Sequence, residues 1–170
     1  MASSLHQEAL QTCLALAREA SDAGDSPFGS CLVDAQGTII KTDRNRTRTG
    51  LDGTGAHPDS TLHPEFTLAQ WAMLNLTADE RASTTCYTTG EHCPMCSAAH
   101  AWCGLGDIVF IASAKQYDHW MRLAGFPLGP VKPLGIGEIT TRIKWHGPVD
   151  SLVGEIKAIH EARWAKQGAP

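Results

Sequence analysis

The sequence predicts an α/β fold, a three-layer α-β-α sandwich in which a mixed five-stranded sheet lies between two layers of helices. Three patterns lead to this prediction. Residues 4–24 carry apolar side chains at helical spacing, residues 27–43 have the pattern of two strands joined by a tight turn, and residues 64–112 alternate between helical and strand patterns. A hairpin followed by alternating helices and strands favours a sheet covered by helices on both faces.

In the first part of the chain, the helix is expected to end at Gly24, and the hairpin strands are expected at residues 27–33 and 38–43 around a turn at residues 34–37. Residues 44–62 show no periodicity and run directly into His63. Because a loop of that length inside a compact domain is usually functional or disordered, we expect it to form a wall or a lid of a pocket.

In the rest of the chain, helices are expected at residues 64–76, 93–102, 113–123 and 150–166, and strands at residues 86–89, 107–112 and, at the sheet edge, 140–145. The run at residues 107–112 is continuously apolar, which is typical of an interior strand covered on both faces. We expect residues 1–170 to form a single domain, with a tail from about residue 127 that closes the pocket.

The composition favours a small substrate. The chain has 170 residues, 42% of them hydrophobic, and a net charge of −4 from 14 basic and 18 acidic side chains. Binding of nucleic acid usually needs a positive face, so we expect no nucleic-acid partner, although Arg44, Arg46 and Arg48 could form a local patch. No signal pattern or run of membrane length is present, so we expect a cytoplasmic protein with no membrane partner.

The most informative stretch is EHCPMC at residues 91–96. Pro94 suits the first position of a helix, where its missing N–H costs nothing, so Cys93 and Cys96 are expected on the opening turn. The free N–H groups and the dipole at that end favour anions, which places both cysteines to be thiolates. A thiolate pair at this spacing is half of a zinc site.

The other half is expected at HPE, residues 63–65, where a second proline predicts another helix start. At the cap, His63 would have non-helical dihedral angles, so its imidazole and the Glu65 carboxylate can converge on one centre. Three protein ligands with water in the fourth position are the pattern of catalytic zinc. We therefore expect one Zn²⁺ per chain on His63, Cys93 and Cys96, with Glu65 moving a proton from the activated water to the leaving group.

A structural site with four thiolates is the alternative for these cysteines. It would use Cys86, Cys93, Cys96 and Cys103, whose spacing is symmetric. Structural sites usually have two close cysteine pairs, whereas Cys86 and Cys103 fall on a predicted strand and a helix end. The site with three ligands is therefore favoured, and we expect Cys13, Cys31 and Cys86 to be core residues.

The HxE motif followed by CxxC resembles the zinc-dependent cytidine deaminase superfamily. Within it, TGEHCPMC at residues 89–96, SAA at residues 97–99 and PFG at residues 27–29 are most similar to the branch of nucleobase deaminases, of the guanine and cytosine type, and tRNA adenosine deaminases. The likeness covers roughly residues 5–126, and the metal motif is its specific part.

The resemblance implies several substrate contacts. Asn45 matches an asparagine that hydrogen-bonds the base or sugar, Phe28 matches a position that lines the pocket, and the backbone carbonyl of Glu91 aligns with one that faces the departing amino group. Trp164 becomes the best stacking surface if the last helix folds over the pocket. From the residues alone, Asn45 also suits a turn, and Phe28 and Trp164 also suit packing.

Two positions depart from the family pattern. His92 replaces a proline, and we expect it to hydrogen-bond substrate or to occupy space near the metal without being a ligand. Pro64 stands where relatives carry a residue whose N–H, in several of them, donates to the base. Because proline has no N–H, an acceptor held there would go unpaired at a cost of about 1–3 kcal/mol. The resemblance therefore implies a substrate that is not bound quite as cytosine or guanine is.

These observations favour a hydrolytic deaminase that removes an exocyclic amino group from a nucleobase or nucleoside-like heterocycle and releases ammonia. A tRNA adenosine deaminase and a non-catalytic zinc-stabilised interaction domain are the alternatives. Oligomers are common in the superfamily, and an apolar helix face around residues 98–102 leads us to expect a homodimer.

Overall fold

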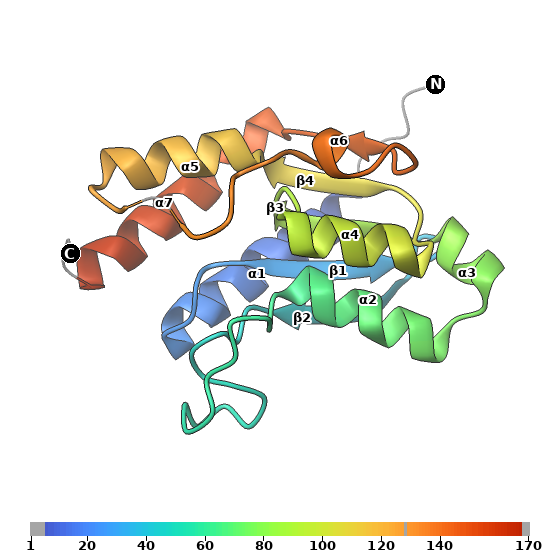
Figure 1. The fold of residues 1–170 in the computed structure, drawn as a ribbon, viewed down its shortest axis with the longest axis horizontal. Coiled ribbons are helices and arrows are strands. Elements are labelled where there is room, and N and C mark those ends of the chain that lie inside the picture. The colour runs from blue at the N-terminus through green and yellow to red at the C-terminus, as the bar shows by residue number, and fades with distance from the viewer. Residues whose placement is uncertain (1–5, 128, 168–170) are drawn as a thin grey trace.

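The computed structural model describes residues 6–127 and 129–167. Its centre is a five-stranded sheet in the order β2-β1-β3-β4-β5 (Figure 1). The strands are β1 (Gly29–Val33), β2 (Ile39–Arg44), β3 (Thr85–Gly90), β4 (Ile108–Ala112) and β5 (Trp145–His146). Strand β1 is antiparallel to both β2 and β3, whereas β3, β4 and β5 run parallel. The sheet is therefore mixed, as predicted.

Helices cover both faces of this sheet. They are α1 (Gln7–Ala23), α2 (Pro64–Asn75), α3 (Ala78–Ser83), α4 (Pro94–Cys103), α5 (Ala114–Leu123), α6 (Ile136–Ile139) and α7 (Asp150–Gln167). Because successive strand side chains point to opposite faces, Val109 packs in the core formed by α1, α5 and α7, while Ile108 packs in the core formed by α2, α4 and α6. Figure 1 shows α2 and α4 side by side on one face, which confirms the three-layer sandwich.

A close approach between α1 and the first residue of β1, Gly29, fixes the position of this strand. A Cβ atom at Gly29 would lie 2.4 Å from the Cys13 carbonyl oxygen and 2.5 Å from the Leu16 Cβ. Only glycine fits this contact without a shift of backbone. The Cys13, Cys31 and Cys86 thiols are buried, as predicted, and none of the six cysteines forms a disulfide within the described residues.

Three elements differ from the prediction. The predicted first helix begins at residue 4, which lies outside the described residues, and α1 is observed from Gln7. Helix α3 was not predicted, although Thr77 and Glu80 form a capping box that the sequence displays. The edge strand predicted at residues 140–145 exists only at its end, because β5 contains Trp145 and His146 alone, and the short helix α6 before it was not predicted.

The sheet ends define where the site lies. Strands β3 and β4 are parallel neighbours, so their carboxyl ends meet at the same edge, next to the first turns of α2 and α4. In open α/β sheets, this edge is the usual place for a ligand. Of the helices in the described ranges, none combines the length and the apolar character needed to cross a membrane.

Candidate metal centre and active site

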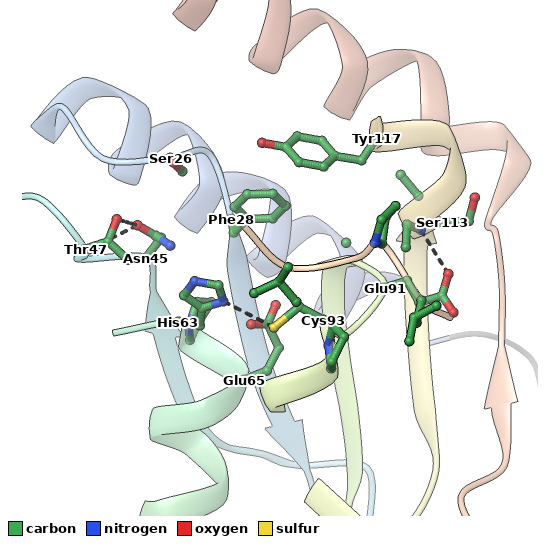
Figure 2. A pocket seen from close by; sticks show the side chains of 18 of the residues that line it. Ser26, Phe28, Asn45, Thr47, His63, Glu65, Glu91, Cys93, Ser113 and Tyr117 are labelled. Atoms are coloured by element: carbon green, nitrogen blue, oxygen red, sulfur yellow. Dashed lines mark hydrogen bonds between the residues drawn. The ribbon is translucent and has the colours of Figure 1, made fainter. Parts of the chain in front are cut away.

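Two helix starts converge at the carboxyl edge of the sheet. His63 is the N-cap of α2 with φ −80° and ψ 137°, and Cys93 is the N-cap of α4 with φ −66° and ψ 168°. Each is followed by a proline in the first helical position, so the local chemistry of both starts is the predicted one. The extended dihedral angles of the caps direct the His63 and Cys93 side chains toward one another (Figure 2).

The donor atoms of His63, Cys93 and Cys96 have the spacing of a tetrahedral zinc site. The two sulfurs are 3.5 Å apart, and the His63 Nδ1 lies 3.7 Å from each of them. Zinc bonds of about 2.3 Å to sulfur and about 2.0–2.1 Å to nitrogen give tetrahedral edges of about 3.5–3.8 Å. The three residues present therefore fit the ion.

The site with four thiolates is not formed. The Cys103 Sγ donates to the Ala69 carbonyl oxygen at 3.2 Å, on the inner side of α2. Cys86 groups with His92 and His100 rather than with Cys93 and Cys96. The alternative that joined all four sulfurs is therefore wrong.

Glu65 is buried beside the three donors, one residue into α2. Its Oε1 accepts a hydrogen bond from the Thr88 hydroxyl at 2.8 Å and lies 3.2 Å from the Ser30 hydroxyl. Ser30 and Thr88 face each other across β1 and β3, so the sheet holds this oxygen from below. The second oxygen, Oε2, lies 3.7 Å from the Cys96 Sγ and stays on the side of the metal donors.

The electrostatics of the four groups favour a cation. The hydrogen bond between the Cys93 and Cys96 sulfurs lowers the pKa of Cys93 to about 4. That bond, together with burial, raises the pKa of Cys96 well above its usual value. Contact with Cys93 raises the pKa of His63, and burial raises the pKa of Glu65. A divalent ion offsets the repulsion between two neighbouring thiolates and binds both in that form.

The donors open into a cavity of about 290 Å³. Its wall is made by two helix starts, two strand ends and a later segment of the chain: Ser26, Phe28, Asn45, Thr47, His63, Pro64, Glu65, Gly90, Glu91, Cys93, Pro94, residues 112–114, Tyr117 and residues 131–134. Pockets for small ligands have volumes of about 300–1,000 Å³, so this cavity is at the small end of that range. It suits a molecule the size of a heterocyclic base.

Asn45 and Phe28 are both in the cavity wall, where the resemblance places them. The Asn45 Oδ1 accepts from the Thr47 N–H at 3.1 Å and from the Thr47 hydroxyl at 2.9 Å, which leaves the amide nitrogen as a donor on the cavity side (Figure 2). Phe28 packs edge to face with Tyr117, with ring centroids 5.2 Å apart. Gly90 makes room for Phe28, since a Cβ there would lie 2.9 Å from the ring.

Glu91 lines the cavity, but its carboxylate binds backbone N–H groups of two later segments. One carboxylate oxygen accepts from the Ala114 N–H at 2.9 Å, and the other accepts from the Ile136 N–H at 2.9 Å. The carboxylate thus joins the start of α5 to the start of α6.

Neither His92 nor Trp164 lies in the wall of the cavity, so of the two roles expected of His92 the structure favours the one that fills space beside the metal-binding turn. His92 is fully buried under α4 with its ring centroid 5.2 Å from that of His100, outside the wall of the cavity. Trp164 packs on Tyr117 and His160, at centroid distances of 6.2 and 5.5 Å, behind the aromatic wall. Helix α7 therefore supports the wall of the pocket from outside.

Sequence reasoning missed Tyr117, residues 131–134, and the hydroxyl pair below Glu65. Ser30 and Thr88 carried a signal, because they are polar side chains in the middle of strands predicted to lie inside the sheet, and both are fully buried. Burial raises the pKa of Tyr117 to about 12, so its hydroxyl stays protonated and can donate. The tail was expected to close the pocket, and residues 131–134 are the part of it that lines the cavity.

A comparison with known families decides the relationship. The family described as the cytidine and deoxycytidylate deaminase zinc-binding region matches residues 3–112, which include all three metal donors and Glu65. The chain belongs to this family. The match confirms the resemblance that the HxE and CxxC motifs indicate.

Several proteins of this deaminase family are similar to the chain. A probable cytosine deaminase of Schizosaccharomyces pombe is 30% identical over 101 residues, which cover 59% of this chain and 56% of that protein. A solved structure from work on adenosine-to-inosine editing at the wobble position of transfer RNA has 28% identity, a TM-score of 0.54, and coverage of 65% of this chain and 78% of the other. The chain spans between 20% and 58% of the length of the curated relatives it matches.

Structural similarity covers more of the chain than the family match does. A guanine deaminase structure from Nitrosomonas europaea has a TM-score of 0.69 at 20% identity and covers 96% of this chain and 86% of that one. The elements that follow residue 112 are thus part of a fold seen before, including those around the cavity.

If Glu65 carries the proton of a hydrolytic deamination, as this family's reaction requires, removal of the Thr88 hydroxyl should reduce the rate of ammonia release. In Thr88→Val, Glu65 loses its shorter hydrogen bond, and a bond to a charged group contributes about 1.5–3 kcal/mol, so kcat should fall about 10- to 100-fold with a smaller change in KM. Thr88→Ser keeps the hydroxyl and should restore most of kcat. Steady-state kinetics of both variants provide the measurement, and a valine variant with the kcat of the wild type would show that the hydroxyl does not position Glu65.

Proposed function

We propose that the protein is a zinc-dependent hydrolytic deaminase that removes an exocyclic amino group from a nucleobase or nucleoside-like heterocycle and releases ammonia. The observation that supports this most directly is the pairing of Glu65 with the three donors. One carboxylate oxygen accepts a hydrogen bond from the Thr88 hydroxyl of the sheet, and the other lies 3.7 Å from the Cys96 Sγ, on the side of the metal donors, where Glu65 lines a cavity of about 290 Å³. Zinc held by His63, Cys93 and Cys96 would supply activation of a water molecule there.

The side chains around the cavity have distinct tasks in this reaction. The Asn45 amide nitrogen donates to an acceptor on the heterocycle, and the Phe28 and Tyr117 rings form an apolar wall beside its plane. Glu65 takes a proton from water and delivers it to the exocyclic nitrogen. A carbon–oxygen bond forms, the carbon–nitrogen bond breaks, and water plus the amino compound give the oxo compound plus ammonia.

A small substrate is favoured over tRNA for two structural reasons. Residues 131–134 close one side of the cavity, and they would have to move for a polynucleotide to deliver a base. Arg44 is paired with Asp25 and Glu19, and Arg46 is paired with Asp43, so these two guanidinium groups already have carboxylate partners. Tight tRNA binding that weakens steeply with salt would contradict this preference and support the tRNA alternative.

Glu65→Gln should abolish turnover while the metal remains bound. The amide cannot accept and return the proton, and loss of acid–base catalysis costs about 10²–10⁴ in rate. Ammonia release across aminopurines, aminopyrimidines and aminotriazines measures the effect, and metal analysis of the same preparation shows that zinc is retained. An unchanged rate in the glutamine variant would contradict the role of Glu65, and no activity of the zinc-loaded wild type on the whole panel would favour a non-catalytic zinc domain.

Pro64→Ala should improve turnover of free cytosine or guanine. Pro64 is in the cavity wall without an N–H, so alanine adds one donor to it. If a ring acceptor of these bases goes unpaired in the wild type, the gain in kcat/KM is about 5- to 150-fold, the equivalent of roughly 1–3 kcal/mol for one buried polar group. Efficient cytosine or guanine turnover by the wild type, with no gain in the alanine variant, is the contrary result.

We also propose a homodimer in which the outer faces of α2 and α4 pair. Trp102 on α4 is 90% exposed, and Leu74 on α2 is 85% exposed, at the ends of two helices that lie side by side. Exposed apolar side chains that form a contiguous patch mark an association surface more often than single exposed apolar residues do.

Trp102→Glu should give a monomer. A buried, unpaired charge at the centre of an interface costs several kcal/mol, so sedimentation velocity should show the mass of one chain. Leu123→Glu, which changes an exposed leucine on α5, is the matched control and should keep the dimer. Equal masses for the wild type and the Trp102 variant would exclude this interface.

A further inference from the structure

A second group of metal-binding side chains lies beneath the candidate active site. Cys86 of β3, His92 in the turn before α4, and His100 of α4 offer ligand atoms that all lie within 4.8 Å of one another. All three side chains are buried, with exposed fractions of 1%, 0% and 0%. The proposed deaminase reaction uses none of them.

Three of the four imidazole nitrogens in this cluster lack a hydrogen-bond partner among the described residues. The His100 Nε2 lies 2.8 Å from the Gly106 carbonyl oxygen, which can only accept, so this nitrogen carries the proton. In a neutral ring, the His100 Nδ1 then holds a lone pair, and it has no hydrogen-bond partner among the described residues. Both nitrogens of His92 are likewise without a partner in the described ranges.

Unpaired nitrogens are costly in this position. A buried polar group that loses its partner costs about 1–3 kcal/mol, and three such atoms lie here together, beside a thiol. An apolar pair of side chains would fill the same space at no such cost. A metal ion that accepts one lone pair from each ring satisfies His100 Nδ1 and one nitrogen of His92, and it also binds the thiol as a thiolate.

We propose that Cys86, His92 and His100 form a second metal site, separate from His63, Cys93 and Cys96, and that it binds copper(I). One thiolate and two neutral imidazoles balance the charge of a monovalent ion, whereas a divalent ion would leave a net positive charge in the core. The group contains no fourth donor among the described residues, which suits a trigonal soft ion better than tetrahedral zinc.

The geometry needs only a small adjustment. Bonds of about 2.0–2.3 Å in a trigonal arrangement put the donor atoms about 3.5–3.7 Å apart, so side chains now within 4.8 Å would close by about 1 Å. Binding forms a copper–sulfur bond and releases the Cys86 proton to solvent. The ion enters already reduced and stays so, and no electron is transferred.

Metal content and X-ray absorption of one preparation test the site. The zinc-loaded protein is treated with copper(I) under anaerobic conditions and freed of loosely bound metal. We expect one zinc and one copper per chain. The copper absorption spectrum should show one sulfur and two nitrogen neighbours. Because this measurement needs no variant, it does not depend on whether an altered core folds.

Variants then assign the ligands. Cys86→Ala and His100→Gln should lose the copper and keep the zinc, and glutamine retains a donor for the Gly106 carbonyl. Cys103→Ala removes a buried thiol outside both clusters and should keep the two metals. Cys13→Ala tests the competing pair of Cys13 and Cys31, whose sulfurs are 3.7 Å apart, and should also keep both.

Several outcomes would overturn the proposal. They are two sulfur neighbours around copper, displacement of zinc by copper, copper binding that survives in Cys86→Ala, a second zinc in place of copper, and no copper retained by the folded wild type. Since metal content is read independently of ammonia release, this result and that for the deaminase reaction can fail separately.

Discussion

The convergence of two helix starts at one sheet edge is the constraint on which the rest of the site depends. Each helix opens with a proline, and each cap residue keeps extended dihedral angles, so His63 and Cys93 project beyond the helix axes toward a common point. A cap side chain can turn toward a metal because the helix does not fix its direction. Helices α2 and α4 pack side by side on one face of the sheet, and β3 leads directly into α4, which brings the two starts within reach of each other.

The position of the Glu65 carboxylate depends on the antiparallel half of the sheet. Glu65 is buried, and burial alone makes its charged form unfavourable. The Ser30 and Thr88 hydroxyls offset this on one oxygen only, and they come from two antiparallel strands in register. The two carboxylate oxygens therefore have different surroundings. The strands fix Oε1, whereas Oε2 faces the metal donors and can accept a proton. Strand register, rather than the helix that carries Glu65, sets this difference.

The sequence predicts the parts of the site that local chemistry determines. His63, Glu65 and the cysteine pair are recognisable because proline, cap and ligand types occur within a few residues of one another. Tyr117 and residues 131–134 reach the cavity only through packing between distant segments, which no local pattern records. Periodicity places Trp164 on a helix face, but it does not say whether that face meets the cavity or the back of its wall. Helix α6 was missed for a similar reason, because its first N–H is satisfied by a carboxylate 45 positions away.

That carboxylate has a consequence for how the molecule holds together. Glu91 follows β3, and its two oxygens accept from the first N–H groups of segments that come 23 and 45 residues later. If the later segments detach, both oxygens lose their partners at the same time, next to the turn that presents Cys93. Detachment of the segments that begin at Ala114 and Ile136 is therefore coupled to disorder of the turn that carries Cys93. A wide movement of these segments during ligand exchange would loosen the metal-binding residues. Exchange through small side-chain motions would leave them in place.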